Sequence, residues 1–407
     1  MLEILQELLK DKKVLIFGFL KEGQLTYKLL KNLNICASLD ITDISFEKDE
    51  KNILSFKTAL ERLNDYDIVF KDENKPMLRP EDYKCLITCQ ADILLKAYKN
   101  DLISVAGSRG KSTVSSMIKG LLKDNCLYMQ DKHPFEYLEY LNKQEVIVLE
   151  IPDSQLLYIH NNATISIIMN CFEETIGEYK DKKDYQEAYK NLYKYQVKGD
   201  NLICNLDFYY RKYPGALSVI GTRRLPFRDL SKIDSHIYGL HNMYNLCVVY
   251  EIAYILDISK EEFGMFVKDF MPLRRHQEFI GSGLLLYFYD DSYSRYINDT
   301  ICAIRSIPSL NTIIIGGNED KNPGLLIEEL YKNRIENVVL FGSFGKEIYN
   351  QMLNNKRKTH VYYCDNYLDT FKKAVDVCEA SKAICLSPAC KTSEKISKDF
   401  REFVNKI

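Results

Sequence analysis

A short apolar run that leads into a loop with two glycines and a lysine constrains this chain more than any other feature. Leu102–Ala106 has the composition of a buried β-strand, and Gly107-Ser108-Arg109-Gly110-Lys111-Ser112-Thr113 follows it directly. Apolar residues then recur at helical spacing over Val114–Leu121, which predicts a helix with one apolar face. A strand, a glycine loop and a helix in this order are typical of α/β proteins that bind phosphate groups.

Each part of the loop suits a nucleotide polyphosphate. The standard phosphate-binding loop has four residues before its Gly-Lys pair, whereas only two separate Gly107 from Gly110. Glycines nevertheless let backbone N–H groups turn toward phosphate oxygens. Lys111 is placed to reach the β- and γ-phosphates, Ser112 can offer its hydroxyl to Mg²⁺, and Thr113 begins the helix whose positive end faces the anion. The sequence predicts an ATP site with Mg²⁺, and a polar turn with an incidental lysine is the alternative.

Strand-like runs alternate with helical stretches along the whole chain, which predicts α/β architecture with parallel sheets. Further buried strands are predicted at 14–18, 67–70, 145–149, 164–169, 284–289, 312–315, 337–341 and 383–386. A helix is expected over Gln24–Asn32. A boundary near residue 92 and the segment Gly281-Ser282-Gly283 divide the chain into three predicted domains, 1–92, 93–281 and 282–407.

Composition excludes several classes of protein. The 407 residues carry a formal net charge of -2, so no basic excess indicates a nucleic-acid or anionic-membrane partner. There is no apolar run of membrane-spanning length. The N-terminal segment Met1–Lys13 is amphipathic with both signs of charge, unlike a secretory signal. The 12 cysteines are scattered without a CxxC pair, which favours buried reduced thiols over zinc or disulfides. We expect a cytoplasmic protein.

The motifs beyond the loop form an ordered series. Glu150 is followed by Ser154-Gln155-Leu156, as in a Glu-Leu-Ser-Ser-Phe-Gln-Leu segment. The series continues with Gly239-Leu240-His241-Asn242-Met243-Tyr244-Asn245, Leu273–Glu278, Asp290-Asp291-Ser292, Gly316-Gly317 with Asp320-Lys321, Phe341-Gly342 and Leu386-Ser387-Pro388-Ala389-Cys390. A Gly-x-x-Gly-Lys-[Ser/Thr] loop followed by this series resembles the Mur ligase superfamily, and its MurD branch in particular. That branch joins D-glutamate to UDP-N-acetylmuramoyl-L-alanine in peptidoglycan synthesis.

The resemblance implies an enzyme of three α/β domains. A Rossmann-like N-terminal domain would bind the UDP-sugar, a central domain would carry the ATPase site, and a Rossmann-like C-terminal domain would bring the amino acid. The resemblance also implies a monomer that acts on small-molecule substrates and uses ATP and Mg²⁺ as cofactors.

The resemblance also assigns roles to individual residues. Lys111 and Glu150 would be catalytic, with Ser112 and Glu150 holding the metal. The ATP-binding set comprises Gly107, Ser108, Arg109, Gly110, Lys111, Ser112, Thr113, Asn242, Asn245, Arg275 and Asp291. Lys321 and Thr392 would bind the amino acid, although a solvated loop lysine is the alternative for Lys321. The UDP-sugar set is Phe19, Leu20 and Asp40, with Asp43 as the alternative carboxylate.

Several positions depart from the superfamily pattern. Thr175 stands where a metal-binding histidine is usual, with Glu173 or Glu174 as the alternative ligand. Tyr189 stands where a carbamylated lysine is usual, next to Lys190. Three further departures are Tyr293 in place of the lysine of Asp-Ser-Lys-Ala-Thr-Asn, the inverted order Arg275-His276, and Lys71-Asp72-Glu73 in place of Ser-Pro-Gly.

Three functions are compatible with this pattern. The first is a MurD-like, ATP-dependent amide-forming ligase. The second is a glutamate ligase with another acceptor, of the folylpolyglutamate or polyglutamate type, which the altered N-terminal segment favours. The third is an ATP-binding scaffold protein without turnover, which the changes at Thr175 and Tyr189 favour.

Overall fold

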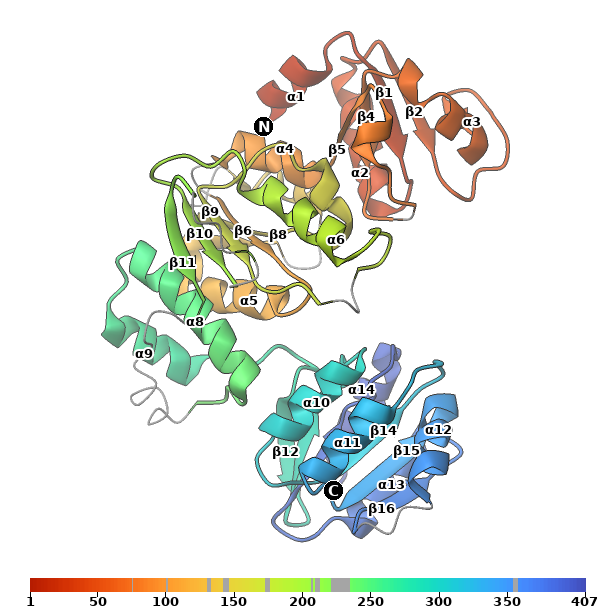
Figure 1. Cartoon of the computed structure of the whole chain (residues 1–407), viewed down its shortest axis with the longest axis vertical. Coiled ribbons are helices and arrows are strands. Elements are labelled where there is room, and N and C mark those ends of the chain that lie inside the picture. The colour runs from red at the N-terminus through yellow and green to blue at the C-terminus, as the bar shows by residue number, and fades with distance from the viewer. Residues whose placement is uncertain are drawn as a thin grey trace. The chain divides into compact units, whose positions relative to one another are not determined.

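The protein is described by a computed structural model that covers residues 1–74, 76–99, 102–129, 133–141, 146–172, 176–205, 208, 213–220, 235–353 and 358–407. These residues form three sheets with helices packed on them (Figure 1). They fall into two compact units. The first contains the first two sheets and Asn245–Phe263, and the second contains Gly264–Ile407 with the segment that ends at Tyr244.

The first sheet is parallel and five-stranded, in the order β3-β2-β1-β4-β5. Its strands are β1 (Lys13–Phe17), β2 (Ser38–Thr42), β3 (Ile53–Leu54), β4 (Ile68–Lys71) and β5 (Leu86–Thr88); its helices are α1 (Leu2–Leu9), α2 (Lys21–Leu33), α3 (Phe56–Glu61) and α4 (Gln90–Ala97), with 3-10 turns at Leu63–Asp65 and Pro80–Asp82. Alternate residues of β1 enter different apolar clusters, Val14 and Ile16 in one and Leu15 and Phe17 in the other. Both faces are therefore covered, which explains the unbroken apolar run.

The second sheet is also parallel, with six strands in the order β11-β10-β9-β6-β8-β7. Its strands are β6 (Leu102–Ala106), β7 (Cys126–Tyr128), β8 (Val146–Glu150), β9 (Ile165–Ile168), β10 (Asn201–Cys204) and β11 (Ala216–Val219). The helices are α5 (Lys111–Leu122) and α6 (Lys182–Tyr189), with 3-10 segments at Lys123–Asn125, Pro134–Tyr137, Asp153–Tyr158 (η7) and Lys190–Leu192. Two further helices, α8 (Leu240–Ile255) and α9 (Lys260–Asp269), each contain a boundary between the two units. All of β6 is buried, and α5 packs on β6, β7 and β8 (Figure 1).

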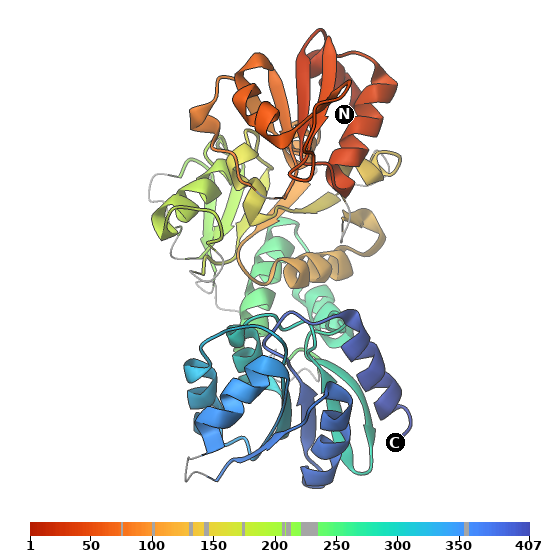
Figure 2. The ribbon, with the colours of Figure 1, turned by 90° about the vertical axis from the view of Figure 1, so that its right-hand side faces the viewer.

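The third sheet has six strands in the order β12-β13-β17-β14-β15-β16, and its edge strand β12 is antiparallel to β13. The strands are β12 (Glu278–Gly283), β13 (Leu286–Asp290), β14 (Leu310–Gly316), β15 (Asn337–Phe341), β16 (His360–Tyr363) and β17 (Ala383–Leu386). The helices are α10 (Ile297–Ser306), α11 (Gly324–Lys332), α12 (Gly342–Leu353), α13 (Tyr367–Val377) and α14 (Glu394–Val404). Helices α10, α11 and α12 supply apolar residues to one face, and α13 and α14 to the other (Figure 2).

The predicted α/β class and the predicted strands agree with this structure. The strand before the loop is β6 with the predicted bounds, and the expected helix at 24–32 lies within α2. The segment Gly281-Ser282-Gly283, which marks the second predicted domain boundary, forms the end of β12. The three domain ranges remain a prediction. Among the described helices, none is both long and apolar enough to cross a bilayer.

Candidate nucleotide-binding site

The glycine loop leaves the middle of the second sheet at the carboxyl ends of its strands. Gly107 and Gly110 have φ of 137° and 83°, values that only glycine adopts without strain. A Cβ on Gly107 would lie 2.7 Å from the Cβ of Met169, and one on Gly110 would lie 2.9 Å from Oδ1 of Asn245. Both glycines are thus required by conformation and by packing.

The loop is fixed to the neighbouring strand end by Asn170. The N–H of Ser108 donates to the main-chain oxygen of Asn170 at 3.0 Å, and the N–H of Arg109 donates to its Oδ1 at 2.8 Å. Nδ2 of Asn170 donates back to the main-chain oxygen of Arg109 at 3.0 Å. The main chain and the amide side chain of Asn170 therefore both help to hold the loop in its shape. We found no signal in the sequence for this role.

Lys111 is the first residue of α5, which begins two residues before the predicted helix start at Thr113. Its Nζ donates to the main-chain oxygen of Gly107, so the side chain curls over the loop. The same Nζ lies 3.6 Å from Oδ1 of Asp153. An ammonium in this position can meet an anion held by the loop.

Ser112 and Glu150 come together although 38 residues separate them. Glu150 ends β8, in register with Val105 of β6, and its Oε2 accepts a 2.8 Å hydrogen bond from Ser112 Oγ. The other carboxylate oxygen accepts a hydrogen bond from the Tyr128 hydroxyl. A serine hydroxyl beside a carboxylate is a pair of hard oxygen donors, and it fits Mg²⁺. Among the described residues, no cluster of three or more His, Cys, Asp or Glu side chains forms a metal site.

Thr175 and Tyr189 both depart from the superfamily pattern, but the structure describes only Tyr189. Thr175, Glu173 and Glu174 lie outside the described residues. Tyr189 is fully buried, and its hydroxyl donates to Oδ1 of Asp153 at 3.1 Å. Asp153, which was not predicted from the sequence, thus contacts both Lys111 and the residue at the position of the usual carbamylated lysine.

The asparagines predicted to approach the nucleotide base lie on α8. Asn245 is buried against the loop, as its distance from Gly110 indicates. Asn242 donates from Nδ2 to the main-chain oxygen of Tyr238 at 3.0 Å. Burial lowers the pKa of the neighbouring His241 to about 4.

In the second unit, Asp291 is buried at the end of β13. Its Oδ2 accepts from Ser387 Oγ at 2.6 Å and its Oδ1 accepts from the N–H of Gln277 at 3.1 Å. Burial raises the pKa of this carboxyl well above its ordinary value. Arg275 and Thr392 both bond to Ser292, the residue after Asp291: Arg275 Nε donates to Ser292 Oγ at 3.1 Å, and Thr392 Oγ1 donates to its main-chain oxygen at 3.2 Å.

Lys321, predicted to bind the amino acid, is held by the chain. Its Nζ donates to the main-chain oxygens of Arg295 at 2.6 Å and Ala389 at 2.9 Å, and it forms an ion pair with Glu319 at 2.5 Å. The second of these oxygens brings Lys321 next to the Ser-Pro-Ala-Cys segment that precedes Thr392.

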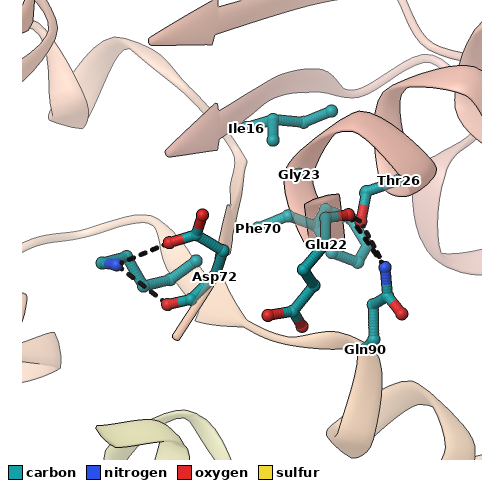
Figure 3. Close-up of a pocket in the computed structure, with 8 residues that line it drawn as sticks. Ile16, Glu22, Gly23, Thr26, Phe70, Asp72 and Gln90 are labelled. Carbon is teal, nitrogen blue, oxygen red and sulfur yellow. Dashed lines mark hydrogen bonds and ion pairs between the residues drawn. The ribbon is translucent and has the colours of Figure 1, made fainter. Parts of the chain in front are cut away.

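The N-terminal glycine loop is lined by carboxylates. Phe19 donates its N–H to Oδ2 of Asp43 at 2.9 Å, whereas the predicted Asp40 pairs with the hydroxyl of Tyr66. Leu20 is 57% exposed. The Asp72 carboxylate, bonded to the buried Lys71, lies so close to Gly18 that a Cβ there would be 2.1 Å from its Oδ1. Asp72 lines a small pocket together with Glu22 and Gln90 (Figure 3).

A cavity of about 360 Å³ joins this region to the second sheet within the first unit. Its walls include Glu22 and Glu73 on one side and His133, Glu150 and Gln155 on the other. Gln155 Nε2 donates to both carboxylate oxygens of Glu22 at 2.9 Å. Burial raises the pKa of Glu22 to about 8, with smaller contributions from nearby carboxylates. Glu150 is thus shared between this cavity and the Ser112 hydroxyl.

Comparison with known proteins finds relatives that match nearly the whole chain. No protein-family profile matches the chain. The UDP-N-acetylmuramoylalanine–D-glutamate ligase of Clostridioides difficile strain 630 is 24% identical, over 98% of this chain and 99% of that protein. The enzyme of the same name from Clostridium perfringens strain 13 is also 24% identical, over 99% and 98%. Among solved structures, the UDP-N-acetylmuramate-alanine ligase MurC of Thermotoga maritima matches with a TM-score of 0.58 and 14% identity, over 97% of this chain and 99% of that one. The chain is similar to Mur ligases over its full length.

A second solved Mur ligase extends the likeness to a nucleotide complex. MurF ligase from Thermotoga maritima, solved in complex with ADP, matches with a TM-score of 0.58 and 12% identity, over 98% of this chain and 97% of that one. The resemblance predicted from the motifs is thus confirmed by relatives that match nearly the whole chain, and the solved structures share its fold.

Proposed function

We propose that this chain is an ATP-dependent ligase that joins D-glutamate to UDP-N-acetylmuramoyl-L-alanine in peptidoglycan synthesis. The observation that carries the proposal is the pairing of Ser112 with Glu150 at the start of α5, beside Lys111, in a chain similar over its full length to enzymes of that name. We further propose that the protein acts in the cytoplasm.

The reaction would pass through an acyl phosphate. A carboxylate oxygen of the acceptor attacks the γ-phosphorus of ATP, the bond to the β-γ bridging oxygen breaks, and ADP leaves. The amine of the amino acid then attacks the acyl carbon, forms the amide, loses a proton and releases phosphate. Ser112 and Glu150 would hold Mg²⁺, which supplies positive charge opposite the phosphate oxygens when bound.

Residues of this chain supply the remaining parts of the proposed reaction. Lys111 would neutralise charge that develops on the transferred phosphoryl group. The loop N–H groups of Ser108 and Arg109 are already bonded to Asn170, so we assign them to loop shape. Asn245, buried against Gly110, is the candidate for the nucleotide base. Lys321 and Thr392 are the candidates for the amino-acid carboxylate.

The test is ADP release by the purified protein with UDP-N-acetylmuramoyl-L-alanine, D-glutamate, ATP and Mg²⁺. We expect release that depends on both substrates, together with a product whose mass equals the sum of the two less water. Folded protein that binds ATP but releases no ADP with these substrates would contradict the proposal.

A second candidate is a glutamate ligase with another acceptor, and the carboxylates at Gly18 favour it. Asp43 occupies the N–H of Phe19, and Asp72 lies against Gly18, where a diphosphate would meet negative charge. A panel of acceptors that carry a free carboxylate, with and without a UDP group, separates the two functions. Preference for the UDP-linked acceptor removes the second candidate, and ATP binding without turnover for every acceptor replaces both with a binding role.

A further inference from the structure

Asp153 receives donors from four side chains beside the phosphate loop. Its carboxylate accepts hydrogen bonds from the hydroxyls of Tyr185 and Tyr189, the second at 3.1 Å. The hydroxyl of Tyr179 donates to the main-chain oxygen of Asp153 at 2.6 Å. Nζ of Lys111 lies 3.6 Å from Oδ1. Donors on several sides fix the direction of a carboxylate, because each bond restricts its rotation.

The tyrosines that hold Asp153 are part of a packed core. Tyr185 and Tyr189 are fully buried, and their ring centroids lie 5.1 Å apart. Tyr179 packs on Tyr185 at 4.9 Å, and Phe208 packs on Tyr189 at 5.1 Å. The hydroxyls of Tyr185 and Tyr189 also bond to each other at 3.0 Å. Close-packed aromatic rings leave these hydroxyls little freedom.

The same cluster reaches the loop at a second point. The hydroxyl of Tyr185 lies 3.3 Å from Oγ of Ser108, within hydrogen-bond distance. Lys111 is held by the main-chain oxygen of Gly107 and by Asp153. The contact with Asp153 is an ion pair at 3.6 Å, so only Gly107 accepts a hydrogen bond from this ammonium. Because an ammonium has three N–H donors, it can still donate to a phosphate oxygen.

Both Asp153 and Tyr189 stand at positions where the chain departs from the family pattern that its motifs resemble. Asp153 stands at the second serine of the Glu-Leu-Ser-Ser-Phe-Gln-Leu pattern, and Tyr189 stands at the usual carbamylated lysine. The negative charge belongs to residue 153, and residue 189 contributes a neutral hydroxyl that bonds to it. A tyrosine hydroxyl and a carboxylate are complementary donor and acceptor.

We propose that Asp153, held by Tyr185 and Tyr189, is the positioning residue that aligns Lys111 for phosphoryl transfer. The expected effect on turnover rests on the proposed function. The alignment of Lys111 by Asp153 does not depend on it. Aligning a cation before reaction lowers the barrier because no reorganisation is needed as charge develops. The carboxylate would also lie near the phosphates of a nucleotide held by the loop, because it pairs with Lys111, so its loss would remove both the alignment of Lys111 and the repulsion of the bound phosphates. Turnover should therefore fall more than ATP affinity.

The first experiment measures acylation of Lys111 by a neutral N-hydroxysuccinimide ester, followed by peptide mass spectrometry. It needs no acceptor. We expect labelling about tenfold faster in Asp153→Asn and about threefold faster in Tyr185→Phe and Tyr189→Phe, since a charge-assisted contact is lost or loosened. Lys119 of α5, whose Nζ donates to the main-chain oxygens of Lys123 and Cys126, is the internal reference.

The matched control is Tyr179→Phe. It removes a hydroxyl from the same aromatic cluster, but that hydroxyl bonds to the main chain of Asp153 and not to its carboxylate. We expect unchanged labelling of Lys111 in this variant. Equal labelling rates in wild type and Asp153→Asn would overturn the proposal. A rise of the same size in Tyr179→Phe would also overturn it, because the tyrosines would then act only through packing.

The second experiment compares turnover with ATP affinity. In Asp153→Asn we expect kcat to fall by about tenfold or more, and the ATP dissociation constant from calorimetry to change by less than about threefold. A fall in kcat matched by an equal fall in ATP affinity would contradict a positioning role. So would a variant in which neither quantity changes. If no acceptor supports turnover, the proposed function fails, and the labelling result still decides whether Asp153 aligns Lys111.

Discussion

Ser112 Oγ and Glu150 Oε2 lie 2.8 Å apart, one at the start of α5 and the other at the end of β8. The parallel pairing of β6 with β8 brings them together, since Val105 is in register with Glu150. The strand pairing alone therefore places the hydroxyl and the carboxylate within hydrogen-bond distance next to the loop. This pair is the site on which the proposed function depends.

Removing the Glu150 carboxylate should remove the metal dependence of nucleotide binding. We expect Glu150→Gln to weaken ATP binding in the presence of Mg²⁺ by about tenfold or more, while binding without Mg²⁺ stays within about twofold, because only the metal-held state needs the charge. Calorimetry with and without Mg²⁺ measures both constants. Glu136, an acidic residue of the same unit paired with Lys21, provides the control variant Glu136→Gln. Equal weakening in the two conditions would count against a metal role.

Lys111 should matter far more for turnover than other lysines of α5. Lys111→Ala is expected to lower ADP release by about 100-fold or more, since a preorganised cation at the transferred phosphoryl group is lost. Lys119→Ala, in the same helix, should change it by less than about twofold. Steady-state release of ADP under the conditions of the ligation assay gives both numbers. Similar losses of ADP release in the two variants would mean that the substitutions act through the stability of α5 and not through the charge of Lys111.

Gly110→Ala should cost more than backbone strain alone. Gly110 and Gly199 both have positive φ, 83° and 104°, but a Cβ on Gly199 meets nothing within 4 Å. Gly199→Ala therefore reports strain alone, about 1 kcal/mol of unfolding free energy. Gly110→Ala adds a contact with Asn245 and should lower stability by about 1 kcal/mol more and weaken ATP binding. Urea unfolding and nucleotide titration measure the two effects; the idea fails if both variants behave alike.

The stability of the first unit should fall as pH rises through the range in which Glu22 ionises. The folded-state pKa of about 8 exceeds the ordinary 4.5, so the folded state holds the proton more tightly. The stabilisation is fully present below about pH 4.5 and is lost as pH rises toward 8, by up to about 1.4 kcal/mol per pH unit. Glu22→Gln removes the titration and should flatten the profile.

Urea unfolding at a series of pH values between about 5 and about 9 gives the free energy of unfolding as a function of pH. Above the folded-state pKa, Glu22→Gln should be more stable than wild type, because the amide carries no charge to bury. The exposed Glu3 offers the matched control Glu3→Gln, which should leave the profile unchanged. A parallel pH dependence in wild type and Glu22→Gln would assign the titration to another group.

Turnover should not depend on dissolved carbon dioxide. Tyr189 cannot be carbamylated, and the anion beside the loop is Asp153. We expect ADP release in carbon dioxide-depleted buffer to equal that in buffer with added bicarbonate. Lys190, whose Nζ is paired with Glu187 at 2.5 Å, is the nearby lysine to exclude. Stimulation by bicarbonate that disappears in Lys190→Ala would show that this lysine is carbamylated instead.

The part of the site that is local in sequence can be predicted from the sequence. The buried strand, the two glycines and the helical stripe after Lys111 each carry their own signal, and their order defines the loop. Glu150 lies in another strand, but it directly follows a second apolar run. Because the carboxyl ends of parallel strands lie at one edge of a sheet, its position near the loop can also be predicted. The α/β class follows from the same alternation of runs.

Contacts between distant elements cannot be predicted in this way. Tyr179, Tyr185 and Tyr189 have the pattern of ordinary core aromatics. Their hydroxyls meet Asp153 only in the folded chain, where α6 packs on η7. Similarly, the choice between Asp40 and Asp43 depends on register. Pairing of Leu15 with Asp40 keeps Asp40 within β2, so that Asp43 is the residue that reaches the loop.

The edge strand of the third sheet was missed for a different physical reason. β12 contains three small residues in Gly281-Ser282-Gly283, so it lacks the alternation by which strands are recognised. Its pairing with β13 is antiparallel and interrupted by a bulge near Gly281, and a turn through Leu284 and Leu285 at positive φ connects the two. A glycine-rich segment is compatible with a hairpin edge as well as with a linker.

The segment from Glu150 to Gln155 makes contact with three different parts of the first unit. Glu150 meets Ser112, Asp153 meets Lys111, and Gln155 meets Glu22. These contacts lie three and two residues apart, so inserting or deleting one residue would shift at least one of them out of reach. Exchange of residue types is compatible with this arrangement, as Asp153 itself illustrates. The length of this segment is therefore under tighter constraint than its composition, and across related chains the number of residues between strand end and glutamine should vary less than their identity.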